Sequence, residues 1–377
     1  MNFNFGREWK ELRKFEKLKE KDRSIVFYAE NKASMNHYKL LIDELTNIEN
    51  LQICYVTSVE DDPMLTRENK KIFTFYIGAG AARIKFFIYL KSKILIMDMP
   101  DLGLFHILKS KVYPVHYIYI FHSMFSVHSY LRKCALDNYN TIFCVGDHHK
   151  REILETEKVY GLQPKKLIEY GFGRLDRLLE EKNNFNQELN QENLIIIAPS
   201  YGNDNLLNIC GLELIEILLN SNFKVILRPH FRIFKESNDL IEKIRKKFEN
   251  DKNFQIEDGV IKPEVFHSSK CMISDWSGIS LEYAFTFERP VIFIDVPKKE
   301  LNEDSKKIPF EPIEISIREK IGFLVNPKNL EQIPNILSKI DNDSRSKEIR
   351  EIRSKTVFNI NKSANIGAEY IKKILDG

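Results

Sequence analysis

The chain has 377 residues, of which 43% are apolar and 29% charged, with a formal net charge of +3. This length exceeds what one hydrophobic core usually organises, so two domains are expected. The near-balance of charge argues against a dedicated nucleic-acid binder, which would carry a basic stripe with interleaved aromatic side chains. The five cysteines are scattered and show no CxxC spacing, which favours buried free thiols in a reducing cytoplasm.

Residues 1–24 form a mixed-charge segment that lacks the apolar core of a signal sequence, and no later apolar run reaches the ~18 residues of a membrane span. A solvated helix is the favoured interpretation. The alternative is a helix lying on a membrane surface, with an apolar face made of Phe3, Phe5, Trp9, Leu12 and Phe15. We therefore expect a cytoplasmic protein, with peripheral contact at the inner face of the membrane as the open alternative.

The first half alternates between apolar segments rich in β-formers and segments with helical spacing. The apolar segments cover residues 24–30, 51–58, 73–80, 82–100, 115–123 and 141–147, and the helical ones include 36–47 and 127–139. Strands separated by helices predict a parallel sheet with helices on both faces. This set closes with "KKLIEYGFGRLDRLLEE" at residues 165–181.

A polar stretch, "KNNFNQELNQEN" at residues 182–193, is the best linker in the chain. The alternation restarts after it, with strand-like segments at 194–200, 223–230, 254–259, 271–275 and 290–297 and helical ones at 207–221, 237–250 and 277–287. The pattern predicts two α/β domains, 1–185 and 190–377. The amphipathic helix at 363–377 is a candidate to cross back to the first domain.

Polar residues follow three strands of the second domain, at the ends where open parallel sheets bind ligands. They are Ser200 after "LIIIAP", Arg228 and His230 in "LRPH", and Asp275 in "SDWSG". The fork of Arg228 suits phosphate oxygens. His230 can donate to a diphosphate or protonate a leaving group near neutral pH.

The "DWSGISLE" stretch predicts a helix that starts at Ser277, whose hydroxyl would cap it. The N–H groups that follow, including that of Ser280, would then face a ligand, and Gly278 would let an oxygen approach the backbone. Glu282, one turn further, would reach a ribose or lie on a solvated face. An ordinary capped helix, with Trp276 as a structural plug, is the alternative.

In the first domain, His122 follows the strand at 115–123 and is the best general-base candidate. His128 is expected on a helix surface, and Asp147 is expected to cap the next helix. Neither the histidines of "GDHHKRE" nor the carboxylates of "DMPD" at 98–101 have the partners of a metal site, so no metal ligand is predicted.

Two further patterns bear on nucleotide binding. The "YGFGRLD" turn lacks the GxGxxG spacing, so Arg174 and Asp176 are expected to brace a turn there, and the chain contains no P-loop motif.

The order "HSMFS", "YGFGRLD", linker, "IAPSYGND", "ILRPHF", "ISDWSGISLEYAF", "RPVIFID" resembles the CDP-glycerol glycerophosphotransferase family, which builds teichoic-acid and capsule polymers. The resemblance covers roughly residues 115–300. It implies a GT-B fold, in which two Rossmann-like, doubly wound domains face a central cleft. The donor nucleotide would bind the C-terminal domain, and the acceptor would approach from the N-terminal one.

The resemblance also implies roles for residues. His122 falls on the catalytic base, Arg228 and His230 fall on the residues that contact the diphosphate, and Asp275, Ser277 and Gly278 fall on the turn that binds the donor phosphates. Two departures stand out: Ser-Met-Phe-Ser follows His122 where the family usually has Gly-Thr-Pro-Leu-Lys, and Gly278 replaces a serine.

The leading hypothesis is a metal-independent transferase without a cofactor. It would move a glycerophosphate or related group from a CDP-linked donor to a hydroxyl of a polysaccharide, teichoic-acid-like or lipid-linked acceptor. One alternative is a GT-B glycosyltransferase or epimerase that uses a UDP- or CMP-linked sugar. The other is a nucleotide-binding scaffold without catalysis.

Overall fold

A computed structural model describes residues 6–185, 191–230, 232–257, 263–298 and 302–377. The chain divides into two compact units: unit 1 is Met1–Arg177, Asn302–Phe310 and Thr356–Gly377, and unit 2 is Leu178–Leu301 and Glu311–Lys355. The division falls after Arg177, before the boundary expected at 185, and it lies within α6 (Gly173–Lys182). The C-terminal helix belongs to unit 1, and so does the segment 302–310, which the sequence did not single out.

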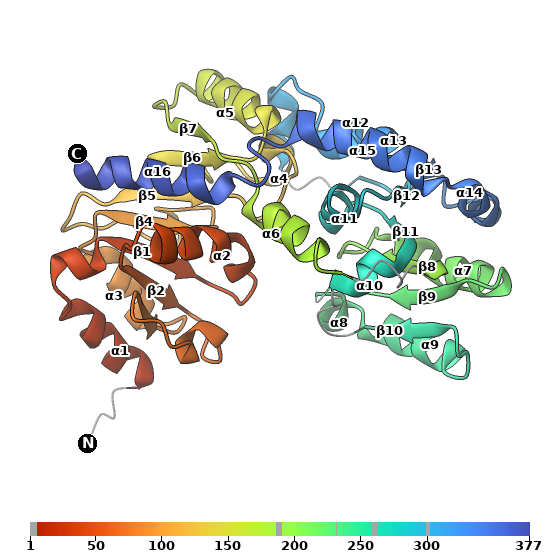
Figure 1. The fold of residues 1–377 in the computed structure, drawn as a ribbon, viewed down its shortest axis with the longest axis horizontal. Helices are drawn as coiled ribbons and strands as arrows, with labels where there is room; N and C mark the ends of the chain where they lie inside the picture. Colours follow the sequence, from red (N-terminus) through yellow and green to blue (C-terminus); the bar gives the residue numbers. More distant parts are fainter. Residues whose placement is uncertain (1–5, 186–190, 231, 258–262, 299–301) are drawn as a thin grey trace. The chain divides into compact units, whose positions relative to one another are not determined.

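Unit 1 is built on a parallel sheet of seven strands among the described residues, in the order β3-β2-β1-β4-β5-β6-β7 (Figure 1). The strands are β1 (Ile25–Ala29), β2 (Ile53–Thr57), β3 (Ile72–Tyr76), β4 (Ile94–Met97), β5 (His116–Ile120), β6 (Thr141–Cys144) and β7 (Lys166–Glu169). Besides α6, the helices are α1 (Arg7–Glu16), α2 (Met35–Asp43), α3 (Ala81–Tyr89), α4 (Val127–Tyr130), α5 (Asp147–Tyr160) and α16 (Ser363–Asp376). The strand order reverses between β1 and β4, which places the switch point of the sheet there.

Strand β1 shows how both faces of this sheet are covered. All of its residues are buried, as is typical of a parallel strand between two layers of helices. Successive side chains point to opposite faces: the ring of Phe27 lies 5.5 Å from that of Tyr38 in α2, and the ring of Tyr28 lies 4.9 Å from that of Phe87 in α3. Helix α16 packs beside α2, where a side chain at Gly367 would collide with Leu41 and Tyr170.

Helix α1 packs its apolar face against its own unit. Leu12 and Phe15 are buried, and the ring of Phe15 contacts Phe75 and Phe86 at 5.5 and 5.3 Å. This part of the face expected for a membrane surface is therefore covered within unit 1, while Phe3 and Phe5 lie outside the described residues. No helix in the described part of the chain is both long and apolar enough to cross a membrane.

The helix predicted at 127–139 is much shorter in the structure, where α4 ends at Tyr130. Tertiary contacts take over the segment that follows: Arg132 forms an ion pair with Asp101, whose own N–H donates to the carbonyl of Ala135. Cys134 adopts a φ of 69°. These interactions override the helical spacing of the sequence.

Unit 2 contains a second parallel sheet, of six strands among the described residues, in the order β10-β9-β8-β11-β12-β13. The strands are β8 (Gln191–Ala198), β9 (Lys224–Leu227), β10 (Phe254–Ile256), β11 (Ser269–Ser274), β12 (Val291–Ile294) and β13 (Gly322–Val325). The helices are α7 (Leu206–Asn220), α8 (Ile233–Glu236), α9 (Asn238–Phe248), α10 (Pro263–Ser268), α11 (Ile279–Phe287), α12 (Ile313–Ser316), α13 (Arg318–Ile321), α14 (Ile333–Lys339) and α15 (Asn342–Thr356). The switch point lies between β8 and β11.

The two strands at this switch point align residue by residue. Ile197 pairs with Ile273, and Ala198 pairs with Ser274. Ser200 and Asp275, which follow these strands, are therefore brought to the same edge of the sheet.

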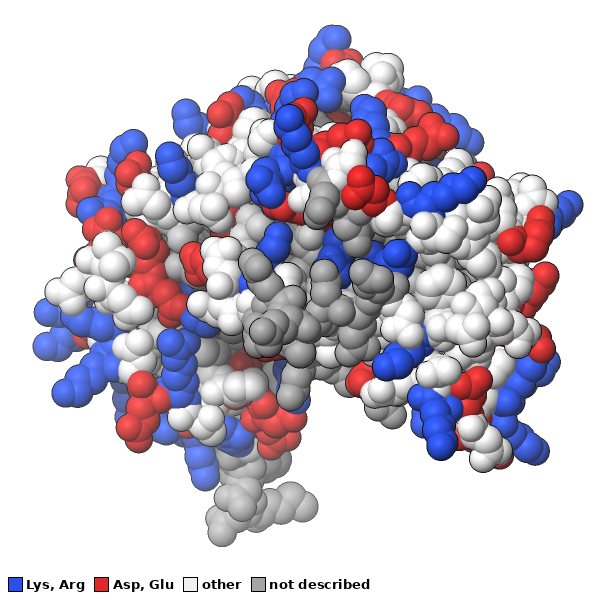
Figure 2. Space-filling view, turned by 45° about the vertical axis from the view of Figure 1, so that its right-hand side comes forward, with Lys and Arg blue, Asp and Glu red and all other residues white. Residues whose placement is uncertain are grey.

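Over the face in Figure 2, acidic and basic side chains are interspersed, in keeping with the net charge of +3.

Candidate active site

Asp275 braces the switch point of unit 2. Its side chain is 2% exposed, and its carboxylate accepts hydrogen bonds from the backbone N–H groups of Ser200 at 2.7 Å and Leu206 at 2.8 Å. The two bonds tie the loop after β8 to the end of β11. The geometry therefore gives Asp275 a positioning role next to the expected phosphate site.

The hydroxyl of Ser200 lies in this braced loop. The residue is 4% exposed, and its Oγ has no hydrogen-bond partner among the described residues. Buried hydroxyls in proteins almost always have a partner. Ser200 is thus a polar group that a ligand oxygen at the switch point would satisfy.

The turn after Asp275 differs in detail from the expected one. Helix α11 begins at Ile279 with Gly278 as its N-cap, so the prediction that the hydroxyl of Ser277 caps the helix is wrong. Instead, the carbonyl of Ser277 accepts from the N–H of Ser280 at 3.1 Å and from its Oγ at 2.7 Å, which tightens the first turn. Because Gly278 has no side chain, it leaves the first N–H groups of α11 without a side-chain cap, as an anion site requires.

The neighbours of this turn are structural. Trp276 donates from Nε1 to the carbonyl of Val296 at 3.0 Å, and the guanidinium of Arg318 lies 4.1 Å from its ring centroid. Arg318 also pairs with Asp295 at 3.1 Å. The tryptophan is therefore held as a plug, and Glu282 is a partly exposed residue of the first turn of α11.

Arg228 and His230 follow β9 at the same edge. The N–H of Arg228 makes a ladder bond to Ile197 at 2.8 Å, and buried Pro229 then takes the chain out of the sheet. Nδ1 of His230 accepts from the N–H of Arg232 at 3.2 Å, so a neutral His230 carries its proton on Nε2.

Tyr201 and Arg232 frame this histidine. Tyr201 follows Ser200 at a strand end where the sequence predicts ligand binding, whereas no sequence pattern pointed to Arg232. The ring of His230 lies 4.8 Å from the ring of Tyr201, and the guanidinium of Arg232 lies 4.2 Å from the centroid of the same tyrosine. These contacts hold the ring of His230 against the loop that carries Ser200.

His122 follows β5 in unit 1, as expected, and is held at both nitrogens. Nδ1 lies 3.2 Å from the carbonyl of Asp98, which can only accept, so Nδ1 donates and a neutral ring has its lone pair on Nε2. Nε2 lies 3.1 Å from Oη of Tyr130, which donates to it. The fixed tautomer is the one that a general base needs.

Asp98, whose backbone carbonyl contacts His122, has its carboxylate in a buried network. It accepts from Oη of Tyr38 at 2.6 Å and from Oγ of Ser34 at 3.0 Å. Burial raises the pKa of Asp98, and the hydrogen bond from Tyr38 and the charge of His122 partly offset this rise. Asp98 is thereby a support for the loop that holds His122, while its sequence neighbour Asp101 pairs with Arg132 at 2.7 Å.

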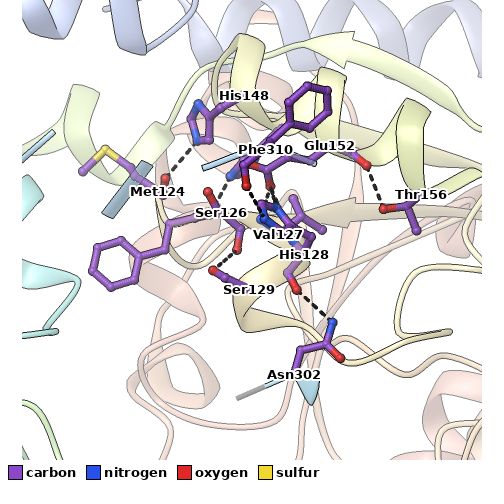
Figure 3. Close-up of polar contacts among 12 residues, drawn as sticks. Met124, Ser126, Val127, His128, Ser129, His148, Glu152, Thr156, Asn302 and Phe310 are labelled. Atoms are coloured by element: carbon purple, nitrogen blue, oxygen red, sulfur yellow. Dashed lines mark hydrogen bonds and ion pairs between the residues drawn. The ribbon is translucent and has the colours of Figure 1, made fainter. Parts of the chain in front are cut away.

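His128 is buried, so the expectation that it lies on a helix surface is wrong. It is 4% exposed, with Nδ1 3.1 Å from a carboxylate oxygen of Glu152 and Nε2 3.1 Å from the carbonyl of Phe310 (Figure 3). The same oxygen of Glu152 accepts from the N–H of Val127 at 2.6 Å, and Asn302 donates to the carbonyl of His128 at 2.8 Å. The contacts fasten the segment Asn302–Phe310 to α4.

The two histidines of "GDHHKRE" brace the loop that follows His122. His148 donates to the carbonyl of Met124 at 3.0 Å (Figure 3), and His149 donates to that of Phe125 at 2.9 Å. Burial lowers the pKa of both, so they are neutral supports. Asp147 does not cap α5, which begins at Asp147 with Gly146 as its N-cap. The described residues contain no group of three or more His, Cys, Asp or Glu side chains that could hold a metal.

Two doubly wound units, each with a histidine and hydrogen-bonding groups at the carboxyl edge of its sheet, define a two-domain α/β protein of the nucleotide-binding type. Solved structures of the same architecture exist. A wall teichoic acid polymerase TagF structure with CDPG is 16% identical, with a TM-score of 0.62 over 98% of this chain and 94% of that one. The Methanocaldococcus jannaschii UDP-GlcNAc 2-epimerase with UDP-GlcNAc and UDP is 13% identical, with a TM-score of 0.58 over 94% and 99%. The fold is GT-B, as expected.

A family model described as CDP-glycerol:poly(glycerophosphate) glycerophosphotransferase matches residues 12–311. The chain belongs to this family and is a transferase of the CDP-glycerol glycerophosphotransferase type. The S. aureus MnaA structure with UDP is a further structural relative, 12% identical with a TM-score of 0.61 over 94% of this chain and 97% of that one. A search of the curated proteins finds no match.

Proposed function

We propose that His122 removes the proton from a terminal hydroxyl of a teichoic-acid-like acceptor, and that this hydroxyl attacks CDP-glycerol bound to unit 2. The observation that carries the proposal is the pair of hydrogen-bond partners at Nδ1 of the two histidines, which imply opposite tautomers. His122 keeps a lone pair on Nε2 because Nδ1 donates to the carbonyl of Asp98, whereas His230 keeps a proton on Nε2 because Nδ1 accepts from Arg232. One histidine is built to accept a proton and the other to donate one.

The reaction balances with these two groups. The acceptor O–H proton passes to Nε2 of His122, the acceptor oxygen forms a bond to the β-phosphorus, and the bond from that phosphorus to the oxygen of CMP breaks. The charge that develops on the departing CMP is stabilised by Arg228, the first N–H groups of α11 and Nε2–H of His230. Ser200 supplies a further donor through its buried Oγ. This scheme uses side chains and amides, without a cofactor.

We place the reaction in a reducing compartment, the cytoplasm. All five cysteines are free, and four of them are buried. A polymeric or lipid-linked acceptor would bring the enzyme to the inner face of the membrane. In α1, Leu12 and Phe15 are buried, so any contact with lipid would have to use the other side chains of this helix.

A second candidate is a GT-B glycosyltransferase or epimerase that acts on a UDP- or CMP-linked sugar. The similarity of the fold to the UDP-GlcNAc 2-epimerase structures supports this alternative.

The decisive experiment follows CMP release from CDP-glycerol with a short glycerophosphate oligomer as acceptor. Growth of the oligomer by one unit for each CMP released is the expected result. Formation of UDP or an epimerised sugar from UDP-sugars, without CMP from CDP-glycerol, would overturn the proposal in favour of the second candidate. A protein that binds CDP-glycerol without turning over any donor would be a scaffold.

Two variants test the roles of the histidines. His122→Ala and His230→Ala should each lower kcat by about 100-fold or more, the usual contribution of a general acid or base. His106→Ala, whose side chain is 43% exposed, is the matched control and should turn over normally. Full activity in both test variants would remove the mechanism.

A further inference from the structure

The "YGFGRLD" turn is a feature of unit 1 that the scheme above does not use. It leaves β7 through Gly171, whose φ of +98° favours glycine, and opens α6 at Gly173. Asp176 accepts from the N–H groups of Asn361 at 2.8 Å and Ser363 at 3.1 Å, and from Oγ of Ser363 at 2.5 Å. The carboxylate thereby anchors the start of α16, which explains the aspartate of the motif.

Arg174 and Arg177 lie one turn apart and so share a face of α6. This face adjoins the start of α2: Nη2 of Arg177 donates to Oδ1 of Asn36 at 3.1 Å. A β-carbon built on Gly173 would lie 3.4 Å from the carbonyl of His37. The N-terminal end of α6, with its partial positive charge, therefore abuts residues 36–37.

His37 connects this face to the catalytic base. It is 6% exposed, its ring centroid lies 6.4 Å from that of His122, and its Nδ1 has no hydrogen-bond partner among the described residues. Burial and the electrostatic influence of Arg174, His122 and Arg177 hold the pKa of His37 well below its ordinary value. The carboxylate of Asp98 accepts hydrogen bonds from Tyr38 and Ser34. His37 therefore lies near two positively charged guanidinium groups and has a buried nitrogen without a hydrogen-bond partner among the described residues.

We propose that Arg174, Arg177 and His37 form a binding site for the phosphate of the acceptor's terminal glycerophosphate unit. The inference rests on the proposed function. One glycerol unit separates the terminal hydroxyl from that phosphate, and the 6.4 Å between the rings of His37 and His122 matches a separation of this size. Two guanidinium forks and a helix N-terminus are the groups that proteins use for phosphate oxygens. The site would place the hydroxyl at Nε2 of His122 and would make the enzyme prefer acceptors that already carry glycerophosphate.

Arg174→Gln tests the site, with CDP-glycerol as donor and either a glycerophosphate dimer or free glycerol as acceptor. Loss of a charge-assisted hydrogen bond should raise the KM of the dimer by about 10- to 100-fold. We expect the KM of CDP-glycerol and the rate with free glycerol to stay within about twofold of the wild-type values, because neither of these two molecules contacts the site. Arg67→Gln, a unit 1 arginine whose side chain is 38% exposed, is the matched control and should behave as wild type.

The preference for the dimer over glycerol separates phosphate binding from a merely structural role, since misfolding would lower both rates together. An unchanged dimer KM in Arg174→Gln would overturn the site, as would an equal loss with both acceptors. Should Arg174→Gln not fold, Arg174→Lys keeps the charge but loses the fork. It should raise the dimer KM by a smaller factor, and an unchanged value would overturn the site.

Binding of the dimer, measured by calorimetric titration of the wild type and the variant without donor, keeps this test separate from the proposed function. The wild type could bind the dimer and release no CMP, while Arg174→Gln fails to bind the dimer. This result would refute the proposed reaction and support the site. Equal binding by the two proteins would refute the site.

Discussion

Asp275→Asn distinguishes a carboxylate that braces the switch point from one that contacts the donor. The wild-type carboxylate accepts two backbone bonds, from Ser200 at 2.7 Å and Leu206 at 2.8 Å. Asparagine has a single side-chain oxygen, so one of these N–H groups would face an NH₂ group and lose its acceptor. Loss of one charge-assisted bond to a buried group costs about 2–4 kcal/mol.

Hydrogen exchange measures this loss of stability at individual backbone amides. An opening free energy lower by about 2–4 kcal/mol corresponds to exchange that is about 30- to 1,000-fold faster at the amide of Ser200 or Leu206. Amides in β10, away from the loop, should be unaffected. Asp204→Asn, an exposed position in the same loop, is the matched control and should leave exchange unchanged.

The variant should also bind CDP-glycerol more weakly, because the loop that carries Ser200 is loosened. The reasoning is refuted if both amides remain as protected as in the wild type while the affinity for CDP-glycerol falls. That result would make Asp275 a direct ligand contact, as the family resemblance first implied.

Two further predictions concern Glu288 and Tyr130. Burial alone would raise the pKa of Glu288, but the hydrogen bond from Arg350 and the charges of Lys182 and Arg353 lower it to about 2. The stability that this depressed pKa confers is present above the unfolded value, near 4.3, and is lost as the pH falls through about 2. Between pH 5 and pH 2, the free energy of unfolding of unit 2, measured by denaturant titration, should therefore fall by about 1–2 kcal/mol more in the wild type than in Glu288→Gln. The same pH dependence in both proteins would refute the network. Tyr130→Phe removes one neutral hydrogen bond to Nε2 of His122, so kcat/KM should change by less than about tenfold; a loss as deep as that of His122→Ala would make Tyr130 itself a carrier of the proton.

The sequence was most informative where chemistry is local. Apolar runs such as that before Asp275 predicted the strands, and the rule that ligands bind beyond their carboxyl ends pointed to Arg228 and His230. The fold followed from the alternation of these runs with helical segments.

What the sequence could not predict depends on contacts between distant residues. Tyr130 and His37 carry no motif, and their positions beside His122 arise only when the sheet forms. His128 has the spacing of a surface residue, yet Glu152 and Phe310 bury it. The prediction that Ser277 caps a helix was wrong, because the carbonyl of Ser277 accepts from Ser280 and helix α11 begins only at Ile279.

The segment Asn302–Phe310 and helix α16 have a consequence for how the protein is made. Both complete unit 1, although they are encoded after most or all of unit 2. During synthesis from the N-terminus, the sheet face that α16 covers would stay open until residues 363–376 leave the ribosome, so unit 1 is completed only after unit 2 has been translated. A truncated chain that ends at the polar linker would expose Leu41 and Tyr170, and such a fragment is more prone to aggregate than to act as an independent half.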